Sequence, residues 1–219
     1  MQGKTIVVTG AGGALGRVVA DVAQARGARV ARLDLKGEGE LAYGADLTDL
    51  AAVQRVMDDI KAKTGRLDAL FNIAGGFAWQ KHADGDLAIW DKMFAINLKT
   101  AATSCKAALP HLVAAGAGAI VNVAALGAVK SGAGMGAYAA SKAGVMKLTE
   151  SLAEELKGKV RVNAVMPSTI DTPANRKDMA DADFSKWVTP TELANVMLFL
   201  ASDDASAITG ALVPVAGRV

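Results

Sequence analysis

The chain has 219 residues, of which 52% are apolar and 21% are charged, and its formal net charge is +2. That length suits one domain whose core needs neither disulfides nor a structural metal. The near-balanced, scattered charge excludes the basic surface of a nucleic-acid-binding protein, and the single cysteine, Cys105, excludes an internal disulfide. We therefore expect one domain over residues 1–219, no metal site, no nucleic-acid partner and a buried, inert Cys105.

Short β-branched runs alternate with longer helical patterns along the chain. Strands are predicted at residues 4–9, 28–34, 67–72, 118–123, 160–165 and 211–215, with a further short strand before Asp46. Helices are predicted at residues 14–27, 47–65, 87–115 and 138–158. Apolar strands without alternation are covered on both faces. The pattern predicts a single-domain α/β fold, a Rossmann-like doubly wound parallel sheet with helices on both faces.

No segment is typical of a membrane span or a signal peptide. The chain begins directly on a predicted strand, and its most apolar stretch, residues 112–129, is interrupted by Asn122. We therefore expect a cytoplasmic protein without a membrane partner.

A glycine-rich turn, TGAGGALG at residues 9–16, follows the first predicted strand and opens the first long helix. Glycine permits positive φ and lets the backbone approach a pyrophosphate, whose charge is stabilised at the helix N-terminus. Such turns also use glycine for geometry alone, but here strand, turn and helix follow one another as dinucleotide binding requires. The motif predicts cofactor contacts from Gly10, Gly13, Leu15 and Gly16.

Asp34 ends the second predicted strand, in RVARLD. A carboxylate there accepts both hydroxyls of an adenosine ribose and repels a 2′-phosphate, which favours NAD(H) over NADP(H). Arg32 and Lys36 flank it and are able to pair with such a phosphate, so NADP(H) is the alternative cofactor. The alternative for Asp34 itself is a solvated strand end.

Two further segments follow the next strands. Asp46 and Leu47 precede a helix, where Asp46 is placed to hydrogen-bond adenine; equally, Thr48 and Asp49 are placed simply to cap that helix. NIAGG, residues 72–76, ends the fourth strand, and its small residues let a cofactor lie against the backbone. The predicted contacts from these two segments are Asp46, Leu47, Asn72, Ala74 and Gly75.

Tyr138 and Lys142, in YAASK, lie four residues apart and share one face of a predicted helix. A free phenol has a pKa of about 10, too high for efficient proton transfer near neutral pH. A nearby ammonium, together with the positive nicotinamide of an oxidised cofactor, stabilises phenolate and lowers that pKa. The spacing predicts a proton-transfer pair.

The segment at residues 168–189 has no clear periodicity, and a loop of that length in a compact domain is usually functional, often a lid. Its tip, Asn175 to Lys177, is consistent with solvated residues. Four apolar side chains are candidates for a slot that holds a planar substrate: Phe77, Trp79, Met135 and Trp187. For Trp187, together with Phe184, docking of the lid into the core is the equal alternative.

With these pieces in place, the chain resembles the short-chain dehydrogenase/reductase family over nearly its whole length. The motifs, in family order, are TGAGGALG, Asp34, ADL, NIAG, INLKTA, YAASK, VRVNAVMPSTIDT and FLASDDASAITG. The resemblance implies an NAD(P)(H)-dependent oxidoreductase of a small-molecule substrate, with Tyr138 as acid/base and Lys142 also holding the nicotinamide ribose. It implies that Asn97 supports Lys142 through water, although Asn97 is also typical of a polar kink in a long helix.

The resemblance has implications for two other regions. Pro167, Ile170 and Thr172 match the positions that contact the nicotinamide carboxamide, although Pro167 also suits the end of the sixth strand. Family members usually pair two long helices, here residues 87–115 and 138–157, into an intersubunit four-helix bundle, which implies a homodimer or homotetramer.

Ala125 stands thirteen residues before Tyr138, where family members usually carry a serine. Alanine neither donates to nor accepts from a substrate oxygen, and removing one such donor typically costs on the order of 100-fold in rate. Three interpretations follow. The protein is a silent dinucleotide binder, Ser131 substitutes for the serine, or the substrate does not need one.

The lid IDTPANRKDMADADFSKWVTP and the segment AGGFAWQ are similar to one branch of the family, the quinonoid dihydropteridine reductases, which also has alanine at that position. This similarity implies hydride transfer from NADH to a quinonoid pterin, with Tyr138 as the proton donor. An electron-poor ring accepts hydride without a serine on a carbonyl oxygen. The alternative functions are a carbonyl or alcohol dehydrogenase and a catalytically silent dinucleotide-binding protein.

Overall fold

The computed structural model describes residues 1–219. Seven parallel strands form one sheet in the order β3-β2-β1-β4-β5-β6-β7. Their bounds are β1 Thr5–Thr9, β2 Arg29–Asp34, β3 Ala42–Gly44, β4 Ala69–Asn72, β5 Gly118–Val123, β6 Val160–Pro167 and β7 Leu212–Val215. Each predicted strand overlaps an observed one, and the predicted doubly wound parallel α/β fold is confirmed.

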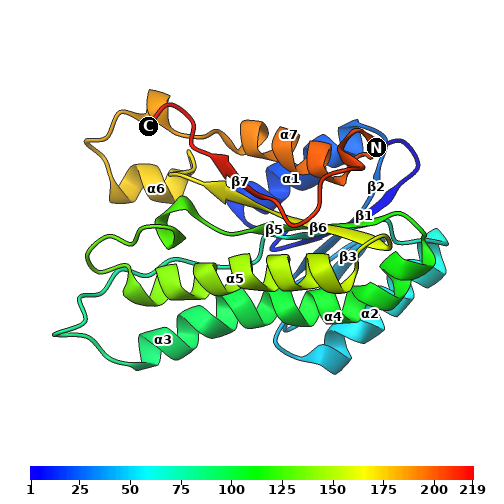
Figure 1. The fold of residues 1–219 in the computed structure, drawn as a ribbon, viewed down its shortest axis with the longest axis horizontal. Coiled ribbons are helices and arrows are strands. Elements are labelled where there is room, and N and C mark those ends of the chain that lie inside the picture. The colour runs from blue at the N-terminus through cyan, green and yellow to red at the C-terminus, as the bar shows by residue number, and fades with distance from the viewer.

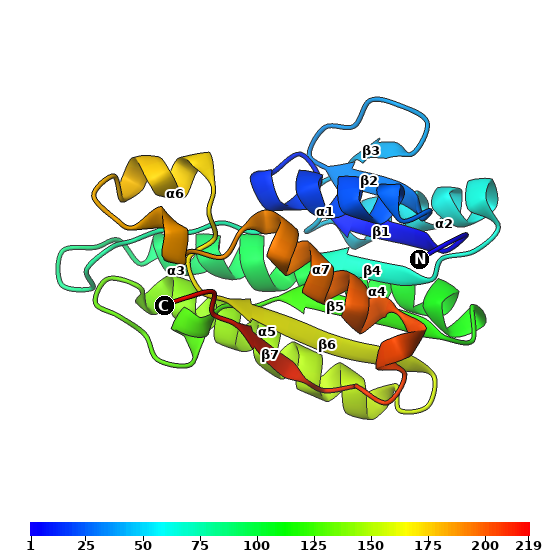
Figure 2. The same ribbon diagram turned by 90° about the horizontal axis from the view of Figure 1, so that it is seen from above.

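Helices cover both faces of the sheet (Figures 1 and 2). On one face, α1 (Ala14–Ala25) and α7 (Pro190–Ala201) pack on β1, β4 and β5 in one apolar core. On the other face, α2 (Leu50–Thr64), α4 (Thr100–Ala114) and α5 (Gly136–Glu155) enclose a second core. Burial on both faces explains the near-continuous apolar runs of the strands. No helix combines the length and apolarity needed to cross a membrane.

The long helix predicted at residues 87–115 is present without a break, but it is not α-helical throughout. It consists of α3 (Ala88–Met93), a π-helical turn (Phe94–Lys99) and α4. Thr100, the first residue of α4, donates a hydrogen bond from its hydroxyl to the carbonyl oxygen of Ile96 in this turn over 2.8 Å. This π-helical turn contains Asn97, whose side chain hydrogen-bonds the Gly76 backbone in the segment that follows β4.

Helix α7 is absent from the predicted elements above, although its start has a recognisable signal. Thr189 and Glu192 form a capping box, and Pro190 occupies the first helical turn. The remaining helix, α6 (Pro173–Asp178), is a short turn within the predicted lid.

The strand order reverses between β1 and β4, since β1 pairs with β2 on one side and with β4 on the other. In open α/β sheets, ligands bind at the carboxyl ends of the strands at such a switch point. The residues that follow β1 and β4 here are the glycine-rich turn and the NIAGG segment. The topology therefore brings the two predicted cofactor segments together.

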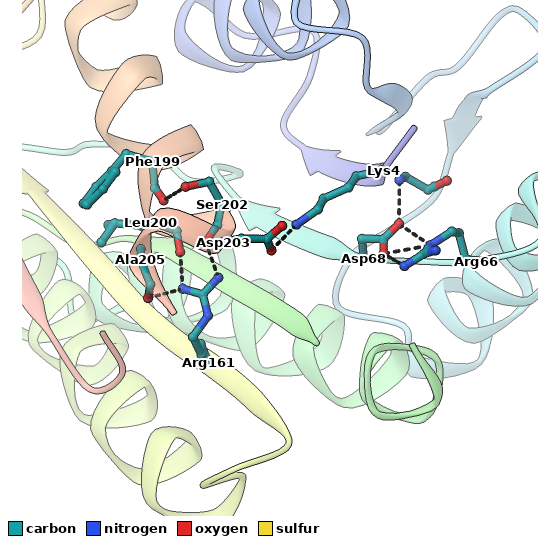
Figure 3. A network of polar contacts seen from close by, with 10 residues as sticks. Lys4, Arg66, Asp68, Arg161, Phe199, Leu200, Ser202, Asp203 and Ala205 are labelled. Atoms are coloured by element: carbon teal, nitrogen blue, oxygen red, sulfur yellow. Dashed lines mark hydrogen bonds and ion pairs between the residues drawn. The ribbon is translucent and has the colours of Figure 1, made fainter. Parts of the chain in front are cut away.

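Polar contacts stabilise the opposite end of the sheet, where the strands begin (Figure 3). The buried Asp68 carboxylate accepts a hydrogen bond from the Thr5 backbone over 2.8 Å and pairs with the Arg66 guanidinium. Lys4, at the start of β1, forms an ion pair of 2.6 Å with Asp203. These contacts hold the beginnings of β1 and β4 together, away from the predicted site.

The same network closes the end of α7. The Arg161 guanidinium donates to the carbonyl oxygens of Leu200, Ser202 and Ala205 over 2.5–2.9 Å (Figure 3). Terminal helix carbonyls have no intrahelical partner, so one side chain from β6 here satisfies three acceptors.

Candidate active site

The glycine-rich turn is packed too tightly for side chains. Gly10 has a φ of +66°, and a Cβ there would lie 2.8 Å from the Ala74 backbone. A Cβ on Gly16 would overlap the Gly10 carbonyl oxygen. Helix α1 then begins at Ala14, and the N-cap residue Gly13 provides no capping side chain. The first backbone N–H groups of α1 are therefore free for an anion, which fits a dinucleotide pyrophosphate.

Asp34 lies at the carboxyl end of β2, directly beside this turn. One carboxylate oxygen accepts from the Gly12 backbone over 2.8 Å and the other from the Leu35 backbone over 2.7 Å. Arg32 is occupied elsewhere, because it pairs with Asp21 over 2.7 Å. The carboxylate is thus oriented at the edge of the turn, where an adenosine ribose fits.

Asp46 and Leu47 follow β3. The exposed Asp46 carboxylate accepts from both the backbone and the hydroxyl of Thr48, and these bonds lower the pKa of Asp46. Asp49 alone caps α2, through bonds to the backbones of residues 51 and 52. The capping interpretation therefore holds for Asp49 and not for Thr48. Leu47 is buried in the core, whereas the Asp46 carboxylate is exposed and is able to accept a further hydrogen bond.

At the end of β4, Asn72 points into the molecule. Its amide donates to Asn122 over 2.8 Å and to the Cys105 sulfur over 3.2 Å. Any contact from Asn72 to a cofactor would therefore come from its backbone. Cys105 is buried as expected, and burial raises the pKa of its thiol to about 12, so it is unreactive.

The next residues form the wall of the switch point. The Ala74 backbone donates to the Thr9 hydroxyl over 3.2 Å and touches Gly10. Gly75 lies between Asn97 and Lys142, because a Cβ there would be 2.5 Å from Asn97 Oδ1 and 3.4 Å from Lys142 Nζ. The predicted residues Gly10, Ala74 and Gly75 thus meet the predicted catalytic residues in one place.

Tyr138 and Lys142 lie one turn apart on α5. Lys142 is 5% exposed, and its ammonium donates to the Val123 carbonyl oxygen, at the end of β5, over 2.7 Å. Tyr138 stands beside Phe77, with ring centroids 4.9 Å apart and an interplanar angle of 74°. The phenol and the ammonium form no direct hydrogen bond in this structure, and the carbonyl oxygen of β5 determines the position of Lys142.

Burial dominates the titration of both groups. It raises the pKa of Tyr138 to about 12 and lowers the pKa of Lys142 to about 8. The direction for Tyr138 is the opposite of the lowering expected from a nearby ammonium, because desolvation penalises the phenolate. At neutral pH, Tyr138 is accordingly a neutral phenol that is able to donate a proton.

Asn97 contacts the end of β4 rather than Lys142. Its Oδ1 accepts from the Gly76 backbone over 2.9 Å, and its Nδ2 donates to the Gly76 carbonyl over 3.1 Å and to Ser141 over 3.0 Å. The side chain thus lies in an irregular helical turn, as the kink interpretation predicts, and also adjoins the site. Asn97 and Lys142 share no direct hydrogen bond, but Asn97 is linked to Gly76 and to Ser141, the residue before Lys142. The support of Lys142 through water stays a prediction.

Ser141 is a site residue that the sequence interpretation missed. Its buried hydroxyl accepts from Asn97 and donates to the Tyr138 carbonyl oxygen over 2.7 Å. It therefore links the π-helical turn to the turn of α5 that carries Tyr138. The sequence signal for Ser141 was its position, as a small hydroxyl residue between Tyr138 and Lys142 on the predicted helix.

No side-chain hydroxyl replaces the serine missing at residue 125. Ala125 is 4% exposed and follows β5 directly. Ser131 lies in an exposed part of the following loop, where its hydroxyl donates to the adjacent Gly132 carbonyl over 3.2 Å. In this conformation Ser131 forms no contact with Tyr138, so the substitution by Ser131 is not observed.

The lid begins beside the predicted nicotinamide residues. Pro167 ends β6, and Ile170 forms a bridge to Val188 that closes the lid at its base. Thr172 caps α6 by accepting from the Asn175 backbone over 3.2 Å. Its hydroxyl hydrogen has no acceptor in the structure and is therefore available to a ligand.

The tip of the lid is not simply solvated. Arg176 forms a two-point ion pair with Asp171 over 2.5 and 2.8 Å and lies over the Phe184 ring. The ring centroids of Phe184 and Trp187 are 4.8 Å apart, and Trp187 is only 5% exposed. Trp187 is therefore a lid residue docked into the core, and it is not part of an open slot with Phe77 and Trp79.

The site as a whole combines an anion-binding helix start, an oriented carboxylate, a half-buried Tyr138 and a buried Lys142 around one switch point. The glycine turn, Asp34 and the backbone at residues 74–76 fit a dinucleotide. A nicotinamide cofactor held there would supply or accept a hydride, and the neutral Tyr138 phenol carries a proton that it is able to donate. These features are typical of an oxidoreductase that uses a nicotinamide cofactor.

Comparison with known proteins agrees with this interpretation. A family model described as enoyl-(acyl carrier protein) reductase matches residues 10–217. D-threitol dehydrogenase of Mycolicibacterium smegmatis is 36% identical over 96% of this chain and 90% of its own length. A 3-oxoacyl-[acyl-carrier-protein] reductase of Thermotoga maritima is 31% identical over 99% and 98%, respectively.

Solved structures agree with the fold. The ligand-free aldohexose dehydrogenase of Thermoplasma acidophilum superposes with a TM-score of 0.91 at 29% identity, covering 99% of this chain and 94% of that one. Carveol dehydrogenase from Mycobacterium avium, in complex with NAD, superposes with a TM-score of 0.89 at 27% identity, covering 99% and 97%. These similarities extend over the whole sheet and its helices.

Proposed function

This chain belongs to the short-chain dehydrogenase/reductase family, and we propose that Tyr138 is the proton donor and acceptor of its reaction. The protein is an NAD(P)-dependent oxidoreductase that interconverts alcohols and carbonyl compounds. The observation that carries the proposal for Tyr138 is its placement one turn before the buried Lys142, beside the glycine-lined switch point.

In the reduction direction, the neutral Tyr138 phenol donates its proton to the substrate oxygen as the carbon receives the hydride. Its pKa of about 12 keeps that proton in place at neutral pH. Lys142, with a pKa of about 8, is mostly protonated at pH 7 and stabilises the phenolate that results. Above pH 8 the lysine loses its charge, so we expect the rate of reduction to decline there.

The contacts of Asp34 support NAD(H) as the preferred cofactor. A carboxylate held by the Gly12 backbone presents negative charge where a 2′-phosphate would lie. Arg32 is paired with Asp21, so the nearby cations without an ion pair are Lys36 and Arg17, whose guanidinium donates to the Gly12 carbonyl oxygen over 3.1 Å. A lower KM for NADPH than for NADH would contradict this preference.

The substrate is not defined by the relatives, which are named for compounds as different as D-threitol and a 3-oxoacyl-[acyl-carrier-protein]. One observation favours a second candidate, reduction of a quinonoid pterin. Ala125 provides no donor for a carbonyl oxygen, and an electron-poor ring needs none. None of the relatives described above is named for a pterin, and this substrate stays a prediction.

The testing experiment is NADH oxidation by the purified protein with ketones, aldehydes and freshly generated quinonoid dihydropterin. Tyr138→Phe should abolish turnover of any accepted substrate, while NADH still binds, as measured by NADH fluorescence. Turnover that survives this change would remove Tyr138 from the mechanism. NADH binding without turnover of any substrate would favour a silent binder.

We also propose that the protein is a homodimer or homotetramer paired through α3, α4 and α5. Leu87, Trp90 and Phe94 recur at helical spacing on α3 and the π-helical turn, and they are 67%, 38% and 55% exposed. Such an apolar stripe is typical of an interface. A monomer by light scattering at micromolar concentration would contradict the proposal. The cytoplasmic location stays a prediction.

A further inference from the structure

Two aromatic side chains stand exposed in the segment that follows β4, although aromatic residues usually bury most of their surface. Phe77 is 58% exposed and Trp79 is 57% exposed. The rings of Phe77 and Tyr138 pack edge to face, with centroids 4.9 Å apart. The exposed part of Phe77 therefore borders the place where a substrate oxygen must meet the phenol.

Trp79 is held against the loop that leads into α5, the helix that carries Tyr138. Its indole N–H donates to the Ala133 carbonyl over 2.8 Å, and the neighbouring Gln80 backbone donates to the Gly134 carbonyl over 2.8 Å. Gly134 has a φ of +75°, and a Cβ there would overlap the indole ring. The indole is thus anchored, its one polar atom is satisfied, and the part that faces solvent is apolar.

The polar side chains around Tyr138 already have partners within the protein. The Asn97 amide is committed to Gly76 and Ser141, and the Lys142 ammonium gives one of its three N–H donors to the Val123 carbonyl. Ala125 contributes only a methyl group. A substrate that carries several hydroxyls would leave some of them without partners, and an unpaired buried hydroxyl is penalised by its desolvation.

From these contacts, we propose that Phe77 and Trp79 form an aromatic platform that selects substrates whose reacting carbon belongs to, or adjoins, a flat apolar ring. Polyhydroxylated chains are disfavoured by the same surface. The proposal rests on the proposed oxidoreductase function and specifies its substrate class. A ring gains stacking and burial on the platform, whereas a polyol gains neither and loses water.

The experiment compares two ketones with NADH as the reductant, the flat bicyclic 1-indanone and the polyhydroxylated erythrulose. We expect kcat/KM to be at least about tenfold higher for 1-indanone. Trp79→Leu should lower kcat/KM for 1-indanone on the order of tenfold through KM, with little effect on a small ketone such as acetone. Phe199→Leu, at a half-exposed aromatic on α7, is the matched control and should change neither.

A binding measurement separates failure of the platform from failure of the proposed function. Indane, which has the ring of 1-indanone without the carbonyl, should bind the NADH complex in calorimetry and bind more weakly to Trp79→Leu. Indane binding without turnover of either ketone would retain the platform and count against the reaction. A preference for erythrulose, an equal loss for all ketones in Trp79→Leu, or no binding of indane would overturn the platform.

Discussion

Gly75 is the residue whose substitution tests the geometry of the site most directly. In Gly75→Ala the new methyl group would lie 2.5 Å from Asn97 Oδ1 and 3.4 Å from Lys142 Nζ. Side chains do not tolerate a contact of 2.5 Å, so either the Asn97 amide rotates or the segment around Gly75 retreats. Both movements separate Asn97 from the Gly76 backbone, and rotation also breaks its bond to Ser141.

The magnitude follows from the bonds that would be lost. Three hydrogen bonds of 2.9, 3.1 and 3.0 Å hold the Asn97 amide. Each contributes about 0.5–1.5 kcal/mol, so losing two or three lowers the free energy of unfolding by about 2–3 kcal/mol. For a chain of this length that corresponds to a fall in Tm of about 5–10 °C. A displacement of about 1 Å near Lys142 should reduce kcat on the order of 100-fold.

The assay combines thermal unfolding with kcat on an accepted substrate and with NADH affinity. Gly136→Ala is the control, because its methyl group would meet the Trp90 ring at 3.4 Å, an ordinary contact. We expect this control to stay within about 0.5 kcal/mol of the original protein. Gly75→Ala with unchanged Tm and unchanged kcat would refute the arrangement described here.

Three other changes probe neighbouring features. Ser141→Ala removes the two hydrogen bonds of a buried hydroxyl and should lower the free energy of unfolding by about 1–3 kcal/mol and reduce kcat, whereas the exposed Ser151→Ala should do neither; equal effects of the two in urea unfolding would contradict the role of Ser141. Because burial lowers the pKa of Lys142 from 10.5 to about 8, the unfolded chain binds more protons between these values, and stability should rise by about 3 kcal/mol as pH increases from 8 to 10.5. Burial of Tyr138 raises its pKa from 10.0 to about 12, which opposes this rise from pH 10 and makes stability fall above about pH 10.5. Lys142→Met should abolish the rise, and denaturant unfolding with the same pH slope in both proteins would exclude this assignment. Asp34→Ser removes the charge that repels a 2′-phosphate and should shift the kcat/KM ratio toward NADPH by about tenfold or more, so an unchanged ratio would remove Asp34 from cofactor selection.

Several features of the fold follow from local patterns in the sequence. The alternation of apolar strands and amphipathic helices was sufficient to predict the parallel sheet, because strands that are buried on both faces have near-continuous apolar sequences. Helix α7 was predictable as well, because Thr189, Pro190 and Glu192 form a start signal within four residues. The π-helical turn at Phe94–Lys99 was not, because its contacts reach Gly76 and Ser141 on other segments.

The titration of Tyr138 shows why spacing alone was insufficient for the site. The interval between Tyr138 and Lys142 places both on one helix face, but the position of each charged atom depends on its surroundings. The Lys142 ammonium donates a hydrogen bond to the Val123 carbonyl oxygen, and burial raises the pKa of the Tyr138 phenol. Likewise, the sequence permitted Trp187 in a slot or in the core, and packing of the lid placed it in the core.

By itself, the sequence determined the fold class, the glycine-lined turn, the carboxylate at Asp34 and the pairing of Tyr138 with Lys142. Each of these depends on residues within a single strand, turn or helix, where backbone geometry is nearly constant. Only the tertiary structure decided that Asn97 binds Gly76, that Ser141 supports Tyr138, that Phe77 stands beside the phenol and that Trp79 is anchored on Ala133. These contacts join segments distant along the chain, so they exist only after the sheet and its helices have packed.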